Sequence, residues 1–174
     1  CDWSSDVCSS DLDIPNTVAG ASASVSDLSP RFLTVHASGG ADMVKAAVER
    51  LPQTSIAAVT VLTSLNPEEL ARLSLPTDTE NLAVALARRA ISAGATSIVC
   101  SPHEAALMRT TLGASVNIIT PGVRLEESQK DDQQRVMTPK AAISQGANYV
   151  VVGRPITKAP HPGEMAAAIK HSLS

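Results

Sequence analysis

The sequence predicts a parallel α/β fold, and three observations support this prediction. Short apolar or β-branched runs alternate with stretches of helical spacing along most of the chain. No tight hairpin signal joins two neighbouring runs. The run over Ser55–Thr63 is almost continuously apolar, as expected of a strand that is covered on both faces. Helices that cross over between parallel strands produce this alternation.

The composition is that of one globular domain. The chain has 174 residues, a formal net charge of −3, 44% hydrophobic residues and 2% aromatic residues. Few aromatic side chains and no excess of positive charge disfavour nucleic-acid binding. No apolar run reaches the length of a membrane span, and there is no signal-peptide pattern. The cysteines Cys1, Cys8 and Cys100 form neither a disulfide framework nor a zinc motif, so we expect a cytoplasmic protein.

Residues 1–12 differ from the rest of the chain. They contain the single Trp and two of the three cysteines, no initiator Met precedes them, and their Ser and Asp residues follow no period. We expect this segment to be a non-native leader, such as a translated adapter, and leave it out of the fold prediction. A native flexible arm is the alternative. The family domain is expected over residues 13–174, where Asp13 and Pro15 read as the start of a helix.

The first half of this domain shows three strand–helix alternations. Gly94 follows the longest predicted helix, as a glycine often does at a helix end. In chain order the predicted elements are a strand over Phe32–His36, a helix over Ala41–Leu51, a strand over Ser55–Thr63, a short helix from Pro67, a helix over Thr79–Ala93 and a strand over Ile98–Cys100.

The second half continues the alternation. Ser101, Pro102 and Glu104 form a good helix start signal, with an N-cap, a proline and a capping-box glutamate. The remaining predicted elements are a strand over Val116–Thr120, a polar loop over Pro121–Val136, a helix from Thr138 to Gly146, a strand over Tyr149–Val152 and a helix over Gly163–Leu173. Five strand–helix units fit either an open doubly wound sheet or part of a (β/α)₈ barrel.

Ligand groups in parallel α/β folds gather in the loops after the strands. Arg124, Gln133, Gly153 and Arg154 fall in such loops. Guanidinium groups bind phosphate in a bidentate manner, and glycine lets backbone N–H groups approach it. Together these residues favour a phosphorylated small-molecule ligand. The alternative for a single arginine is a surface ion pair.

Two further residues have modest expected roles. His36 is expected to form a wall below the ligand, with acid–base chemistry as the alternative. Cys100 is expected to pack as a small hydrophobic side chain.

Seven motifs in order resemble the orotidine 5′-phosphate decarboxylase family, most closely its bacterial branch. The resemblance covers residues 13–174, and the order and spacing of the motifs make it specific. The motifs are Asp13–Thr17, Thr34–Gly40, Val59–Ser64, Val99–Ser101, Pro121–Arg124, Asp132–Arg135 and Val152–Ile156. A hexulose-phosphate synthase relative is an alternative that the strings at Val59–Ser64, Pro121–Arg124 and Asp131–Arg135 disfavour.

The resemblance implies a TIM (β/α)₈ barrel, a homodimer with sites at the subunit interface, and conversion of orotidine 5′-monophosphate to UMP and CO₂ without cofactor or metal. By position it implies substrate contacts for Thr63, Arg124, Gln133, Gly153 and Arg154, chiefly around the phosphate. In the implied mechanism, loop closure on the phosphate supplies remote binding energy, and a lysine ammonium stabilises and then protonates the carbanion.

The resemblance also implies a network of alternating lysine and aspartate residues around the substrate, and part of this network is not found in the sequence. Asp13 matches the last residue of an Asp-x-Lys-x-x-Asp motif that serves the neighbouring subunit, and Thr17 is expected to reach the same site. Cys8 and Ser10 stand where the motif has Asp and Lys. The strand that carries an earlier lysine of the network has no counterpart. Asp13 is therefore the remaining member of the network, and the catalytic lysine is absent.

The chain is accordingly expected to be an incomplete barrel with about five carboxyl-terminal strand–helix units. The leader imitates at most part of a further strand. Because an open sheet leaves edges exposed, we expect the isolated chain to be aggregation-prone and without detectable decarboxylase activity. The alternatives are a non-catalytic module that binds a phosphate ligand, or a fragment without function.

Overall fold

The computed structural model describes residues 7–123 and 137–173. Its described part contains a six-stranded, entirely parallel sheet in which the strands follow chain order. This confirms the parallel α/β prediction. The strands are β1 (Val7–Asp11), β2 (Phe32–His36), β3 (Ser55–Val59), β4 (Ser97–Val99), β5 (Asn117–Pro121) and β6 (Tyr149–Val151).

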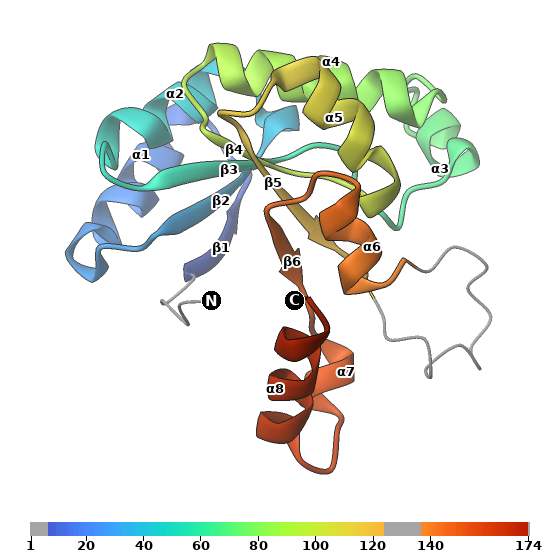
Figure 1. Cartoon of the computed structure of the whole chain (residues 1–174). Helices are drawn as coiled ribbons and strands as arrows, with labels where there is room; N and C mark the ends of the chain where they lie inside the picture. The colour runs from blue at the N-terminus through green and yellow to red at the C-terminus, as the bar shows by residue number, and fades with distance from the viewer. Residues whose placement is uncertain (1–6, 124–136, 174) are drawn as a thin grey trace.

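Helices cover the outer, convex side of the curved sheet (Figure 1). Two of them, the last in the chain, lie beyond the β6 edge of the sheet (Figure 1). The helices are α1 (Pro15–Ser24), α2 (Ala41–Arg50), α3 (Pro67–Arg72), α4 (Thr79–Ser92), α5 (Ala105–Leu112), α6 (Pro139–Ser144), α7 (Arg154–Thr157) and α8 (Pro162–Ser172), with short 3₁₀ turns η1 (Ser26–Leu28), η2 (Ala37–Gly39) and η3 (Pro102–Glu104).

Strand β1 corrects the expected number of strands. It lies within residues 1–12, which the sequence analysis left out of the fold, and it pairs with β2 through Val7 opposite Leu33 and Asp11 opposite Val35. The register between these two pairs is irregular. The described sheet therefore has six strands and not five. That residues 1–12 are a non-native leader stays a prediction.

The core lies between the sheet and the outer helices. Leu33 and Val35 of β2 are fully buried and belong to a cluster that includes Met43 and Val44 of α2. A second cluster joins β4 and β5 to the helices α3–α6. Since alternate side chains of a strand point to opposite faces, Phe32, Thr34 and His36 of β2 face the inner, concave side.

Several element boundaries differ from the predictions by one or more residues, and three of these differences lie next to candidate site residues. Strand β3 ends at Val59 and not at Thr63, because a turn over Leu62–Leu65 follows it. Helix α7 begins at Arg154, where the sequence predicts a loop. The first helix has Ile14 as its N-cap, and not Asp13.

Arg109 of α5 ties together the loops at the amino ends of β5 and β6. Its guanidinium donates to the carbonyl oxygens of Gly113, Val116 and Gly146 at 2.7–2.9 Å. It also donates to Asn148 Oδ1, which accepts a hydrogen bond from the backbone of β5. These contacts position the last two strands of the sheet.

Candidate functional site

The carboxyl ends of the six strands lie along one edge of the sheet, because all strands run in the same direction. Five of the seven predicted site residues belong to the described part of the chain and follow strands at this edge. They are Asp13, Thr17, Thr63, Gly153 and Arg154. The other two, Arg124 and Gln133, lie outside the described residues.

Gly153 and Arg154 directly follow β6. Gly153 is exposed, and a Cβ atom added to it would meet no heavy atom of the described residues within 4 Å. Its φ of −98° lies outside the left-handed region, and its ψ of −98° lies outside the usual α and β regions. Arg154 begins α7 and is also exposed. Among the described residues, none crowds the Cβ position of Gly153, and an exposed arginine follows it in the chain.

Thr63 lies in the turn after β3 and is exposed. At Thr60 the backbone still pairs with the neighbouring strand, because the Thr60 N–H donates to the carbonyl of Val99 at 3.0 Å. Beyond this bond the chain turns, and the backbone N–H of Leu65 donates to the carbonyl of Leu62. This turn places the Thr63 hydroxyl at the carboxyl edge of the sheet.

Asp13 and Thr17 follow β1, at the opposite end of the sheet from β6. Asp13 Oδ1 accepts a hydrogen bond of 2.7 Å from the backbone N–H of Ile14, just before α1 begins. Both Asp13 and Thr17 are exposed. Asp13 and Thr17 thus follow the same edge of the sheet as Gly153 and Arg154, but they follow β1, which is at the other end of the strand order from β6.

His36 is the last residue of β2, and Cys100 directly follows β4. His36 is half-buried at the end of β2. Cys100 follows β4 and is 1% exposed, which confirms its expected packing as a small hydrophobic side chain. Burial and, to a smaller extent, the charge of Glu104 together raise the pKa of its thiol to about 12. Such a thiol stays protonated and is a poor nucleophile.

Glu104 is a buried carboxyl group at this edge whose environment the sequence analysis did not foresee. The predicted capping box is present: Glu104 Oε2 accepts from the backbone N–H of Ser101, and Ser101 Oγ accepts from that of His103. Glu104 is only 7% exposed. Its pKa is raised to about 7, mainly by burial and also by the charge of Glu80, while the hydrogen bond from the Ser101 N–H opposes this rise. The motif predicted the hydrogen bonds but not the burial.

Neither of two cavities in the described part of the chain is lined by a predicted site residue. One lies between α7 and α8, and the other lies beside the end of α2. Within residues 7–123 and 137–173, no group of three or more His, Cys, Asp or Glu side chains is arranged to hold a metal ion. No helix among the same residues is long and apolar enough to cross a membrane.

Comparisons with known proteins agree on one family. The model of the Orotidine 5'-phosphate decarboxylase / HUMPS family matches residues 12–169. An orotidine 5'-phosphate decarboxylase of Thermobifida fusca is 54% identical over 161 residues, which are 92% of this chain and 69% of that protein. One of Frankia casuarinae is 50% identical over 93% of this chain and 59% of that protein.

Solved structures agree with the sequence comparisons. The crystal structure of the orotidine 5'-phosphate decarboxylase from Lactobacillus acidophilus is 33% identical, with a TM-score of 0.81, over 95% of this chain and 73% of that one. The enzyme from Pyrococcus horikoshii is 25% identical, with a TM-score of 0.71. The fold is therefore the expected barrel fold, present here as an incomplete barrel. By its sequence and its fold, this chain belongs to the orotidine 5′-phosphate decarboxylase / HUMPS family.

Proposed function

We propose that the chain carries the phosphate-binding side of an orotidine 5′-monophosphate decarboxylase site. The observation that carries the proposal is the exposed Gly153–Arg154 pair after β6, in a chain whose relatives are decarboxylases. An open backbone and a guanidinium group suit the 5′-phosphate shared by the substrate and UMP. Arg124 and Gln133 are proposed to contact the same ligand, and Thr63 to contact it from the turn after β3.

The proposal gives Asp13 and Thr17 a role across a dimer. Both are exposed at the carboxyl edge of β1, so their side chains are accessible to another subunit. A homodimer and a cytoplasmic location, both expectations from the sequence, are included in the proposal. The chemistry is that of a carboxy-lyase, and it needs an ammonium group to stabilise and protonate the carbanion left by the departing CO₂.

An assay of turnover tests the decarboxylation step separately from binding of the ligand. Ser10 stands where the family resemblance expects the lysine, so we predict no detectable formation of UMP from orotidine 5′-monophosphate by the purified chain. The assay follows the loss of substrate absorbance, with the Thermobifida fusca relative as the positive control. Turnover at the level of that enzyme would show that the proton comes from a different group and would refute the proposed consequence of Ser10.

A further inference from the structure

Two aromatic side chains and one arginine meet on the inner side of the sheet. Phe32 begins β2 and Tyr149 begins β6, and their rings make an edge-to-face contact with centroids 5.1 Å apart. Arg31, which precedes β2, donates from Nη2 to the Tyr149 hydroxyl at 2.6 Å. Its guanidinium also lies over both rings, at 5.5 Å and 5.3 Å from their centroids. Arg31 therefore connects the amino end of β2 to the amino end of β6.

The amino end of β6 is held by side chains of two other parts of the chain. Strand β6 has only three residues, and among the described strands it pairs only with β5. Just before it, Asn148 Oδ1 accepts hydrogen bonds from Arg109 of α5 and from the backbone N–H of Ile118. The next residue, Tyr149, accepts the hydrogen bond from Arg31. These contacts add to the backbone pairing of a very short strand.

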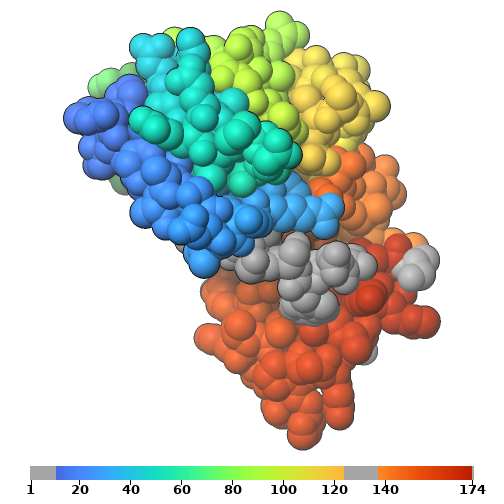
Figure 2. Space-filling view, turned by 90° about the vertical axis from the view of Figure 1, so that its left-hand side faces the viewer, coloured from blue at the N-terminus to red at the C-terminus, as the bar shows by residue number. Residues whose placement is uncertain are grey.

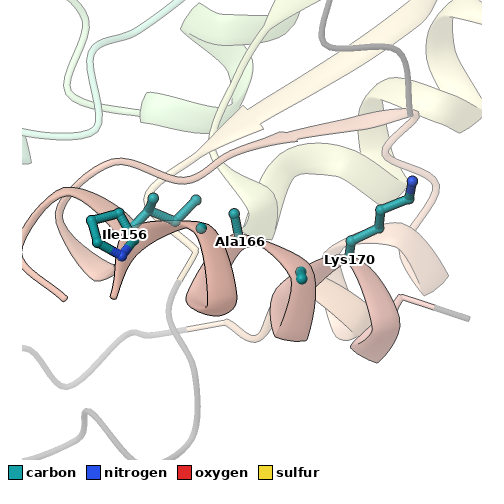
Figure 3. A pocket seen from close by; sticks show the side chains of 6 residues that line it. Ile156, Ala166 and Lys170 are labelled. Atoms are coloured by element: carbon teal, nitrogen blue, oxygen red, sulfur yellow. The ribbon is translucent and has the colours of Figure 1, made fainter. Parts of the chain in front are cut away.

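The segment after β6 has less support. Helix α7 follows Gly153 directly, and none of its residues is buried. Helices α7 and α8 project from the rest of the molecule (Figures 1 and 2). A cavity of about 640 Å³ lies between them, with Ile156, Ala166 and Lys170 in a row along it (Figure 3). Gly153 is four residues from Tyr149, at most about 13 Å along an extended chain. Its position therefore depends on how β6 is held at its amino end.

We propose that Arg31 is a positioning residue for the phosphate site. Through Tyr149 it fixes β6, and with β6 the backbone of Gly153 and the start of the helix that carries Arg154. Arg31 precedes β2 at the amino end of the sheet, whereas Gly153 follows β6 at the carboxyl end, so Arg31 acts without touching the ligand. Hydrogen bonds to a phosphate weaken steeply when their donors move, so a small shift of β6 lowers the affinity. The inference rests on the proposed function and deepens it.

The test compares two exposed arginines by calorimetry with UMP. Arg31→Ala is expected to weaken UMP binding at least fivefold, and Arg31→Lys, which keeps a cation and a donor beside Tyr149, to recover most of the affinity. Arg50 is the matched control, because it is exposed and lines the same cavity beside the end of α2 as Arg31 does. Arg50→Ala removes the same charge and is expected to leave the affinity unchanged. Equal affinities of Arg31→Ala and Arg50→Ala would overturn the proposal.

A second variant tests whether Arg31 acts through Tyr149. Tyr149→Phe keeps the ring next to Phe32 and removes only the hydroxyl that accepts from Arg31. It is expected to weaken UMP binding by less than Arg31→Ala does, because the guanidinium keeps its place over the ring. The double variant is expected to bind UMP no more weakly than Arg31→Ala alone. Additive losses in the double variant would overturn the proposal, since they would show that Arg31 acts by a different route.

Hydrogen exchange without ligand separates this inference from the proposed function. In Arg31→Ala, exchange is expected to be at least threefold faster at the backbone amides of residues 149–153 and unchanged in β2–β4, whereas Arg50→Ala changes neither. Exchange that is faster throughout the sheet would overturn the proposal, because it would show a general role in stability. Faster exchange at residues 149–153 in a chain whose original form does not bind UMP would keep the positioning of β6 and count against the proposed function.

Discussion

At the scale of single residues, Gly153 is a position where a role in ligand binding can be distinguished from a role in the fold. A glycine that is required by the fold has a positive φ or a close neighbour, and Gly153 has neither. Gly40, by contrast, has a φ of +89° where the chain turns into α2, so the conformation itself favours glycine there. Neither a left-handed φ nor a crowded Cβ position thus accounts for the glycine after β6, and close approach of a ligand is the reason proposed here.

We predict that Gly153→Ala leaves the chain folded and weakens UMP binding about tenfold, which corresponds to about 1.4 kcal/mol. The added methyl group has no described protein atom within 4 Å but occupies the space proposed for the phosphate. Thermal unfolding and calorimetry on the same preparation measure the two effects. An unchanged affinity for UMP would mean that the phosphate does not lie against this backbone.

At the scale of elements, the junction between β4 and α5 is sensitive to pH. Glu104 has a folded-state pKa of about 7, compared with an ordinary value of 4.5. Below pH 4.5 the carboxyl is protonated in both the folded and the unfolded chain. Between the two values the unfolded chain releases this proton and the folded chain keeps it, so the free energy of unfolding falls as the pH rises towards 7.

Glu104→Gln removes the decrease in the free energy of unfolding at higher pH, and it keeps an acceptor for the Ser101 N–H. We expect the variant to be more stable than the original chain at pH 8 by about 2 kcal/mol, after allowing for solvent access to the carboxyl, and equally stable near pH 4.5. Urea unfolding across this pH range measures the difference. The exposed first-turn residue Glu68 provides the control variant Glu68→Gln. A Glu104→Gln profile parallel to the original would contradict the burial of this group.

The elements also show what the sequence could predict. The capping box of Ser101 and Glu104 was predictable because its hydrogen bonds join residues three positions apart. The burial of Glu104 was not, because it depends on packing that includes α4. The role of Arg109 was not predictable either: its acceptors are mostly backbone carbonyls, which every residue has, at positions up to 37 residues away.

The candidate site was predictable to a similar extent. The sequence placed Gly153 and Arg154 after the last strand, and the structure shows them exposed there. It did not place Arg154 at the start of a helix, because α7 is only four residues long and shows no helical period. The distances between candidate residues depend on the curvature of the sheet, which no local pattern in the sequence specifies.

At the scale of the whole molecule, the direction of the strands and the curvature of the sheet determine how the candidate residues are arranged. The alternation of strands and helices predicted the fold class, and the contact between Phe32 and Tyr149 shows that the sheet curls as a barrel does. This contact joins residues more than a hundred positions apart, so it could not be read from the local pattern. In the curled sheet the candidate residues follow β1, β3 and β6 along a single edge.

The most direct test of the central claim is calorimetry of the chain with UMP and with uridine, which differ by the phosphate alone. We predict that UMP binds at least a hundredfold more tightly than uridine, and that Arg154→Gln removes at least tenfold of this preference. Arg88→Gln, at an exposed arginine of α4, is the control and keeps the full preference. Equal binding of UMP and uridine by the folded chain would contradict the claim that the edge after β6 binds phosphate.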